Sequence, residues 1–119
     1  MKPKDRDRAD LKFRAFSDPT RLRILHLLQQ GELCVGDLVQ IIAVPQPTAS
    51  RHLAYLRKAG LVQARKNGLW IHYSLVPPAN SFHQKLLECL KSCFHEVNKL
   101  KSDSARARKL RKSGGCCPN

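Results

Sequence analysis

Residues 43–75 read AVPQPTASRHLAYLRKAGLVQARKNGLWIHYSL, and this stretch decides the fold. The first half predicts a helix, because Pro47 suits a first helical position and Gly60 suits the position after the last turn. Its apolar residues recur at helical spacing, which predicts that one face of the helix is buried. The residues of that buried face are Ala49, Leu53 and Leu56.

The second half of the stretch predicts a β-hairpin. Asn67-Gly68 lies between two apolar runs, and this pair is typical of a two-residue turn because both positions accept positive φ. A helix followed by a hairpin, with basic residues near the hairpin tip, is the second half of a winged helix-turn-helix.

Other helices are predicted on both sides of this stretch. Asp18 suits an N-cap and begins a helix that stops near Gly31, and a shorter helix covers about residues 35–42. A weakly periodic first helix precedes them, within residues 7–16. A long helix over 81–101 follows the hairpin, with Ser81 and Gln84 as a capping box. The predicted fold class is therefore mainly α with a small β-hairpin, in one domain over residues 1–103 followed by a flexible basic tail over 104–119.

The charge balance points to nucleic acid as the partner. Lysine and arginine number 22 against 9 aspartates and glutamates, which gives a formal charge of +13 and a pI near 10.1. No apolar run approaches the ~20 residues of a membrane span, and the N-terminus MKPKDRDRAD lacks the apolar core of a signal peptide. We therefore expect a cytoplasmic protein that binds double-stranded DNA and does not enter a membrane.

The residues expected to contact DNA lie on the outward side of the helix predicted between Pro47 and Gly60, and on the wing. An α-helix fits the major groove, where polar side chains reach base edges while arginine and lysine hold phosphates. The candidates are Gln46, Thr48, Ser50, Arg51, His52 and Tyr55 on the helix, and Arg65, Lys66 and Asn67 on the wing. His52 also has the alternative of a buried, hydrogen-bonded histidine.

Four motifs in register resemble the ArsR/SmtB family of metalloregulatory repressors. They are DPTRLRILHLL (18–28), ELCVGDLVQ (32–40), PQPTASRHLAYLRKAGLV (45–62) and RKNGLWIHYSL (65–75). The resemblance implies a homodimer built mainly through the first and last helices, which binds a palindromic operator. It also implies that an inducer weakens DNA affinity and so releases transcription.

The family's usual arsenite site does not carry over to this chain. Arsenic sensors of the family often have Cys-Val-Cys at the start of the third helix, whereas this chain has Cys34-Val35-Gly36. With one thiolate of two remaining, we interpret Cys34 as a small buried hydrophobic residue.

The other four cysteines are better candidates for the inducer site. Cys89 and Cys93 share one helical face at i and i+4, whereas nothing about packing requires adjacent cysteines at 116 and 117 in a polar tail. Soft thiolates select soft ions, and in the chemistry of this family trivalent arsenic or antimony takes three sulfurs. We expect three of the four to bind the inducer: Cys89, Cys93, Cys116 and Cys117. Methylated trivalent arsenic would need only two of these thiolates.

Two rival sensors fit the same scaffold. In the first, oxidant or persulfide links the last helix to the tail, since basic surroundings favour reactive thiolates. In the second, zinc or cadmium binds near His83, His95 and Glu96. An enzyme is not expected, because the chain has no phosphate-binding glycine loop and no H-E-x-x-H motif.

Overall fold

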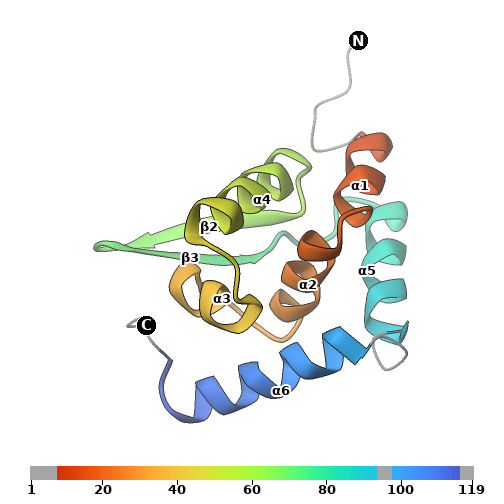
Figure 1. Ribbon diagram of the computed structural model, residues 1–119. Helices are drawn as coiled ribbons and strands as arrows, with labels where there is room; N and C mark the ends of the chain where they lie inside the picture. Colours follow the sequence, from red (N-terminus) through yellow and green to blue (C-terminus); the bar gives the residue numbers. More distant parts are fainter. Residues whose placement is uncertain (1–7, 94–97, 116–119) are drawn as a thin grey trace.

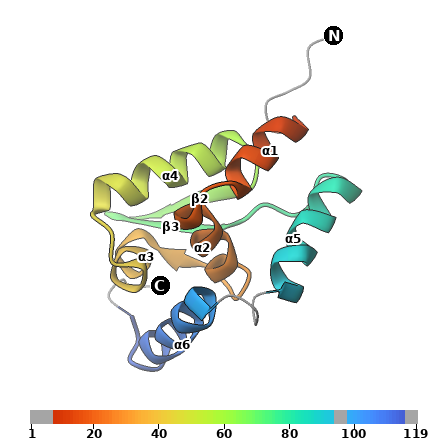
Figure 2. The same cartoon turned by 45° about the vertical axis from the view of Figure 1, so that its right-hand side comes forward.

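The computed structural model describes residues 8–93 and 98–115, without the side chains of Cys93 and Asn98. Within these ranges the helices pack around one small sheet, as shown in Figures 1 and 2. In chain order the elements are α1 (Ala9–Phe16), α2 (Pro19–Leu28), β1 (Leu33–Cys34), α3 (Val35–Ile42), α4 (Gln46–Lys58), β2 (Val62–Asn67), β3 (Trp70–Leu75), α5 (Ser81–Cys93) and α6 (Asn98–Lys112).

The predicted winged helix-turn-helix is confirmed. α3 and α4 are the helix-turn-helix pair, and Ala43 in the left-handed conformation (φ 62°) ends α3 and begins the turn between them. The wing is the β2–β3 hairpin. The predicted inward face of α4 is also confirmed, since Ala49, Leu53 and Leu56 are fully buried.

The helix starts follow their N-cap residues, with one correction. The Asp18 carboxylate accepts a hydrogen bond from the Arg21 amide (3.0 Å), as predicted for α2. The capping box predicted at Ser81 is wrong. Asn80 is the N-cap instead, and its side-chain oxygen accepts from the His83 amide at 2.9 Å. The Gln84 side chain does not cap the helix and donates instead to the Glu88 carboxylate.

The hairpin turn lies one residue further along than predicted. Asn67 pairs with Trp70 as the last pair of the ladder, so the two turn residues are Gly68 and Leu69. Gly68 has φ +63°, and Leu69 is not among the residues with positive φ, a pattern that needs glycine only at the first turn position.

The sheet also contains a strand that the sequence pattern did not reveal. β1 is two residues long, and it pairs antiparallel with β3 so that Leu33 faces Tyr73 and Cys34 faces His72. The strand order is therefore β1-β3-β2. Because β1 runs directly into α3, the wing and the helix-turn-helix are joined through one continuous backbone segment.

The single helix predicted over 81–101 is wrong in its bounds. α5 spans Ser81–Cys93, residues 94–97 lie outside the described residues, and a separate helix α6 begins at Asn98. The flexible tail predicted from residue 104 is likewise helical as far as Lys112. α6 is stable as a helix because it buries Leu100, Asp103, Ser104 and Ala107, an i, i+3, i+4, i+7 stripe.

Polar contacts hold α6 across α2 and α3. Asp103 is fully buried and accepts two hydrogen bonds from the Arg23 guanidinium, at 2.7 and 3.0 Å. Ser104 is within hydrogen-bond distance of His26 (2.7 Å) and accepts from Gln30 (2.6 Å). A bidentate arginine–carboxylate pair fixes orientation as well as distance, so α6 has a defined register on α2.

The core lies where α1, α2, α3 and α4 meet the sheet. Its fully buried members include Ala15, Ile24, Leu25, Leu27, Leu38, Leu53, Leu56 and Leu61. No helix among the described residues has the length and apolar character that crossing a bilayer would require.

Breaking the Arg23–Asp103 pair should destabilise the fold. Asp103→Ala leaves a mostly buried guanidinium without its carboxylate, so we expect the free energy of unfolding to fall by about 3–5 kcal/mol. Urea denaturation measures this loss. The double variant Arg23→Met/Asp103→Leu should recover most of it, because no buried charge remains unpaired. A loss below about 1 kcal/mol for Asp103→Ala would contradict this account.

The histidines buried in the core should make stability depend on pH. Burial lowers the pKa of His26 and of His83, and Lys12 lowers that of His83 further. The unfolded chain then binds protons more readily than the folded chain below about pH 6.5. We therefore expect the free energy of unfolding to be constant above that pH and to fall below it, by at most about 1.4 kcal/mol per pH unit for each histidine.

Urea titrations between pH 5 and pH 8 measure this slope. His83→Asn keeps an acceptor for the Ala79 amide and removes the titrating group, so its slope should be smaller than that of the wild type. An equal slope in both proteins would show that His83 is not responsible.

Candidate nucleic-acid interface and thiol positions

The outward face of α4 carries the residues predicted to read DNA. Gln46, Ser50 and Arg51 are exposed, and Thr48, His52 and Tyr55 are half-buried. Pro45 is the N-cap residue and forms no side-chain cap hydrogen bond within the described structure. Pro47 has no amide hydrogen and the Ala49 amide donates to the Pro45 carbonyl at 3.1 Å, so the amides of Gln46 and Thr48 are the first-turn donors left for a phosphate, the anion that a helix N-terminus favours.

His52 and Tyr55 also have a partner inside the protein. The Arg21 guanidinium lies over the Tyr55 ring, 4.2 Å from its centroid, and its Nη1 is 3.4 Å from His52 Nδ1. Arg21 also donates to the backbone carbonyls of Ala15 and Arg14. Arg21 thus ties α4 to the α1–α2 corner, and it fixes the tilt of the face that the sequence assigned to DNA.

The wing presents its charges differently from the prediction. Arg65 donates two hydrogen bonds to Glu32, at 2.6 and 3.2 Å, and these hydrogen bonds lower the pKa of the Glu32 carboxyl. Arg65 and Lys66 are both exposed and Asn67 is half-buried, but Arg65 is paired with Glu32, whereas Lys66 has no carboxylate within ion-pair distance among the described residues. Beyond them Leu69 projects from the tip with 96% of its surface exposed.

The thiols predicted to bind the inducer are only partly within the described residues. Cys89 is exposed and free, on α5. The side chain of Cys93 and all of Cys116 and Cys117 lie outside the described residues. In the part of the chain that the structure covers, no three His, Cys, Asp or Glu side chains are grouped closely enough to hold a metal ion.

Cys34 has a larger role than a small core residue. It is 1% exposed, as expected, but it is also the N-cap of α3, and its Sγ accepts from the Asp37 amide at 3.4 Å. Cys34 is also disulfide-bonded. The capping role was not predicted, because cysteine is not among the residues that usually cap helices.

His83, the histidine considered for a zinc site, is an interior residue. It is fully buried, its Nδ1 accepts from the Ala79 amide at 3.2 Å, and the Lys12 charge lowers its pKa. His95 and Glu96 lie outside the described residues. A neighbouring cation and a buried ring both oppose a divalent ion at His83.

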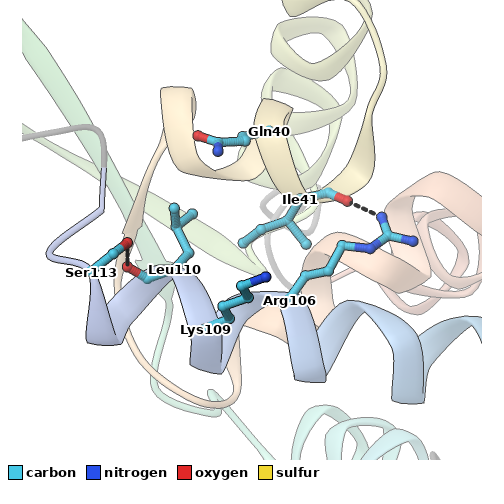
Figure 3. A pocket seen from close by; sticks show the side chains of 6 residues that line it. All are labelled: Gln40, Ile41, Arg106, Lys109, Leu110 and Ser113. Atoms are coloured by element: carbon cyan, nitrogen blue, oxygen red, sulfur yellow. Dashed lines mark hydrogen bonds between the residues drawn. The ribbon is translucent and has the colours of Figure 1, made fainter.

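A shallow recess separates α3 from the C-terminal half of α6. Figure 3 shows Ile41 and Leu110 beside it, with Arg106 donating to the Ile41 carbonyl at 2.7 Å. Gln40, Lys109 and Ser113 complete its lining. The lining residues that the structure describes include no thiol, carboxylate or imidazole, so this part of the recess has the chemistry of a helix–helix seam.

Comparisons with known proteins agree with this geometry. Residues 18–64 match the family model described as "Bacterial regulatory protein, arsR family". The arsenical resistance operon repressor of Escherichia coli is 44% identical over 85 residues, which cover 71% of this chain and 73% of that protein. A cadmium resistance regulatory protein CadC homolog from Staphylococcus aureus is 45% identical over 64 residues, 53% of each chain. Among solved structures, HlyU from Vibrio cholerae aligns with a TM-score of 0.63 at 33% identity, over 71% of this chain and 88% of that one.

The Glu32–Arg65 pair should limit the electrostatic contact of the wing with DNA. Glu32→Gln frees Arg65, so we expect tighter binding to a non-specific duplex and a salt dependence of log K that is steeper by about one. Lys66→Ala should weaken binding and reduce the slope by about one. Fluorescence anisotropy at several salt concentrations measures both.

Glu88→Gln is the matched control, because it removes one exposed carboxylate on α5, away from the wing. If Glu32→Gln and Glu88→Gln change the slope equally, the effect comes from net charge and Arg65 has no contact with phosphate.

Proposed function

The chain belongs to the ArsR family of bacterial DNA-binding transcriptional regulators, and from this premise we propose that it is a repressor released from its operator by trivalent arsenic or antimony. The observation that supports a metalloid inducer is the number of cysteines in the chain, which include the adjacent pair Cys116-Cys117. Soft trivalent ions prefer thiolate sulfur to the nitrogen and oxygen donors of the rest of the chain. The identity to an arsenical resistance repressor supports the same ligand.

In this proposal α4 enters the major groove and the wing lies along the flanking backbone. Ser50, Arg51 and Gln46 on the exposed face reach base edges or phosphates, with Thr48, His52 and Tyr55 beside them. Lys66 and Asn67 contact the backbone, joined by Arg65 when it leaves Glu32.

The protein acts in this proposal as a homodimer on a palindromic site. Phe13 of α1 is 57% exposed and packs edge-on against Phe82 of α5, with ring centroids 5.1 Å apart. This leaves an apolar surface shared by the first helix and α5. A second copy covering that surface would place two α4 helices on successive major grooves, about one DNA turn apart.

In this proposal the inducer is bound by three of the four cysteines that the sequence indicates: Cys89, Cys93, Cys116 and Cys117. α6, about 22 Å long, runs from the end of α5 to α3, so its two ends lie on opposite sides of the molecule (Figures 1 and 2).

A thiol redox sensor is the second candidate function. The disulfide at Cys34 favours it, because this cysteine caps the first helix of the helix-turn-helix and its oxidation state bears directly on that helix. A sensor of divalent zinc or cadmium is a weaker alternative, since His83 is buried beside a cation.

Arsenite should release the reduced protein from DNA. The assay is fluorescence anisotropy of a labelled duplex that the protein itself has selected from a random library, with a phosphine reductant present. We expect a fall in affinity of about 5–150-fold, the usual range of allosteric coupling. Cys116→Ser/Cys117→Ser should abolish the response.

Cys89→Ser/Cys93→Ser, run in parallel, decides whether α5 supplies donors. If arsenite leaves the wild type on DNA while an oxidant releases it, the protein is a redox sensor and the metalloid proposal fails.

A further inference from the structure

The tip of the wing carries three consecutive apolar side chains that protrude from the body of the molecule. Leu69 is 96% exposed, Trp70 39% and Ile71 38%. Tyr73, closer to the core on β3, is only 8% exposed, and Figure 1 shows the β2–β3 hairpin extending beyond α3 and α4. Glycine and polar residues are usual at a hairpin turn, so a run of exposed apolar residues there indicates a binding surface.

The base of the wing is fixed to the end of α4. Leu61 links α4 to β2 and is fully buried. Its amide donates to the Leu56 carbonyl of α4 at 3.0 Å, and its carbonyl accepts from the Val76 amide, just after β3, at 2.9 Å. The tip, residues 66–71, continues the two strands that start from this anchor. Its direction relative to DNA therefore follows from the placement of α4.

The charge of the hairpin matches a polyanion. Residues 62–75 contain one arginine and one lysine, and neither aspartate nor glutamate. Lys66 is exposed and lies opposite Ile71 in the ladder, on one face of the hairpin. Asn67 lies opposite Trp70 on the other face. Polar groups thus flank the apolar tip on both faces, which is the order that suits a DNA groove, with bases at its floor and phosphates along its walls.

We propose that Leu69 is a wedge that enters the minor groove beside the operator half-site and kinks the DNA there. Apolar side chains that insert between base pairs unstack them and bend the duplex by about 20–90°, and leucine is one of the residues that do so. This inference rests on the docking of α4 and the wing in the proposed function, and it is independent of the inducer.

The kink gives the protein a means of recognition that needs no hydrogen bond to a base. Pyrimidine–purine steps such as TA unstack easily, whereas A-tracts are stiff, so Leu69 makes affinity depend on a step that the side chain does not read directly. A tip that only placed Lys66 in the groove would have the opposite preference, because the narrow minor groove of an A-tract attracts cations.

The bend is measured by fluorescence resonance energy transfer between dyes at the two ends of a duplex that the protein itself has selected from a random library. We expect the wild type and Leu69→Met to bend this duplex, because methionine keeps an apolar side chain of similar volume. Leu69→Ala and Leu69→Lys should lose most of the bend. The Leu69 side chain is almost fully exposed, so these variants should unfold in urea as the wild type does.

An equal bend in the wild type and Leu69→Ala would overturn the inference. So would tighter binding by Leu69→Lys with the bend retained, because that result assigns the tip to phosphate contacts. An unchanged bend with weaker self-association of Leu69→Ala would overturn it in favour of a second copy of the chain as the partner of the tip.

The preference for flexible steps is tested on the same selected duplex. The wild type should enrich pyrimidine–purine steps outside the bases that α4 reads, and an A-tract placed there should weaken its binding about tenfold. Leu69→Ala should bind both duplexes equally. Tighter binding of the wild type to the A-tract duplex would overturn the inference and leave the docking of α4 standing. A wild type that selects no sequence from the library would contradict the docking in the proposed function itself.

Discussion

The buried pair between Arg23 and Asp103 is the contact on which the C-terminal half of this structure depends. It joins residues 80 positions apart in the sequence, and Asp103 is completely buried. Because both guanidinium–carboxylate hydrogen bonds must be satisfied together, the pair fixes where α6 crosses α2. Arg23 also donates to the Ile42 carbonyl at the end of α3, and Arg106 donates to that of Ile41. The register of α6, and with it the point where the chain leaves that helix, follows from these few bonds.

The architecture joins the wing and the helix-turn-helix through a very short segment. Residues 32–34 hold the wing through Glu32, pair with β3 and begin α3. Any ligand that prefers one arrangement of this segment must also change DNA affinity, and DNA must change the affinity for that ligand by the same factor.

Local sequence signals were sufficient for most of the helices and for the hairpin, but not for β1, for α6 or for long-range partners. The Asp18 cap, the apolar face of α4 and the glycine of the hairpin are encoded within a few residues, and all three are present in the structure. α6 was missed although alanine, arginine and lysine favour helices, because half of its buried stripe is polar, Asp103 and Ser104. Burial of these two depends on Arg23, His26 and Gln30, which no local pattern connects to them. The pairing of Arg65 with Glu32, and the nearness of Gly115 to Asp37, are equally products of the tertiary fold.

The polar character of the α6 seam makes it suitable for regulation. Buried ion pairs and hydrogen bonds gain little net free energy, because the desolvation of the same groups offsets most of the attraction. α6 adds few apolar anchors to these bonds, mainly Leu100, Ala107 and the half-buried Leu110. Its docking is therefore specific in geometry but modest in free energy. A bond that forms at the end of such a helix and favours another position of it needs to supply only a modest free energy to displace the helix. A helix docked through a large apolar face would resist the same bond.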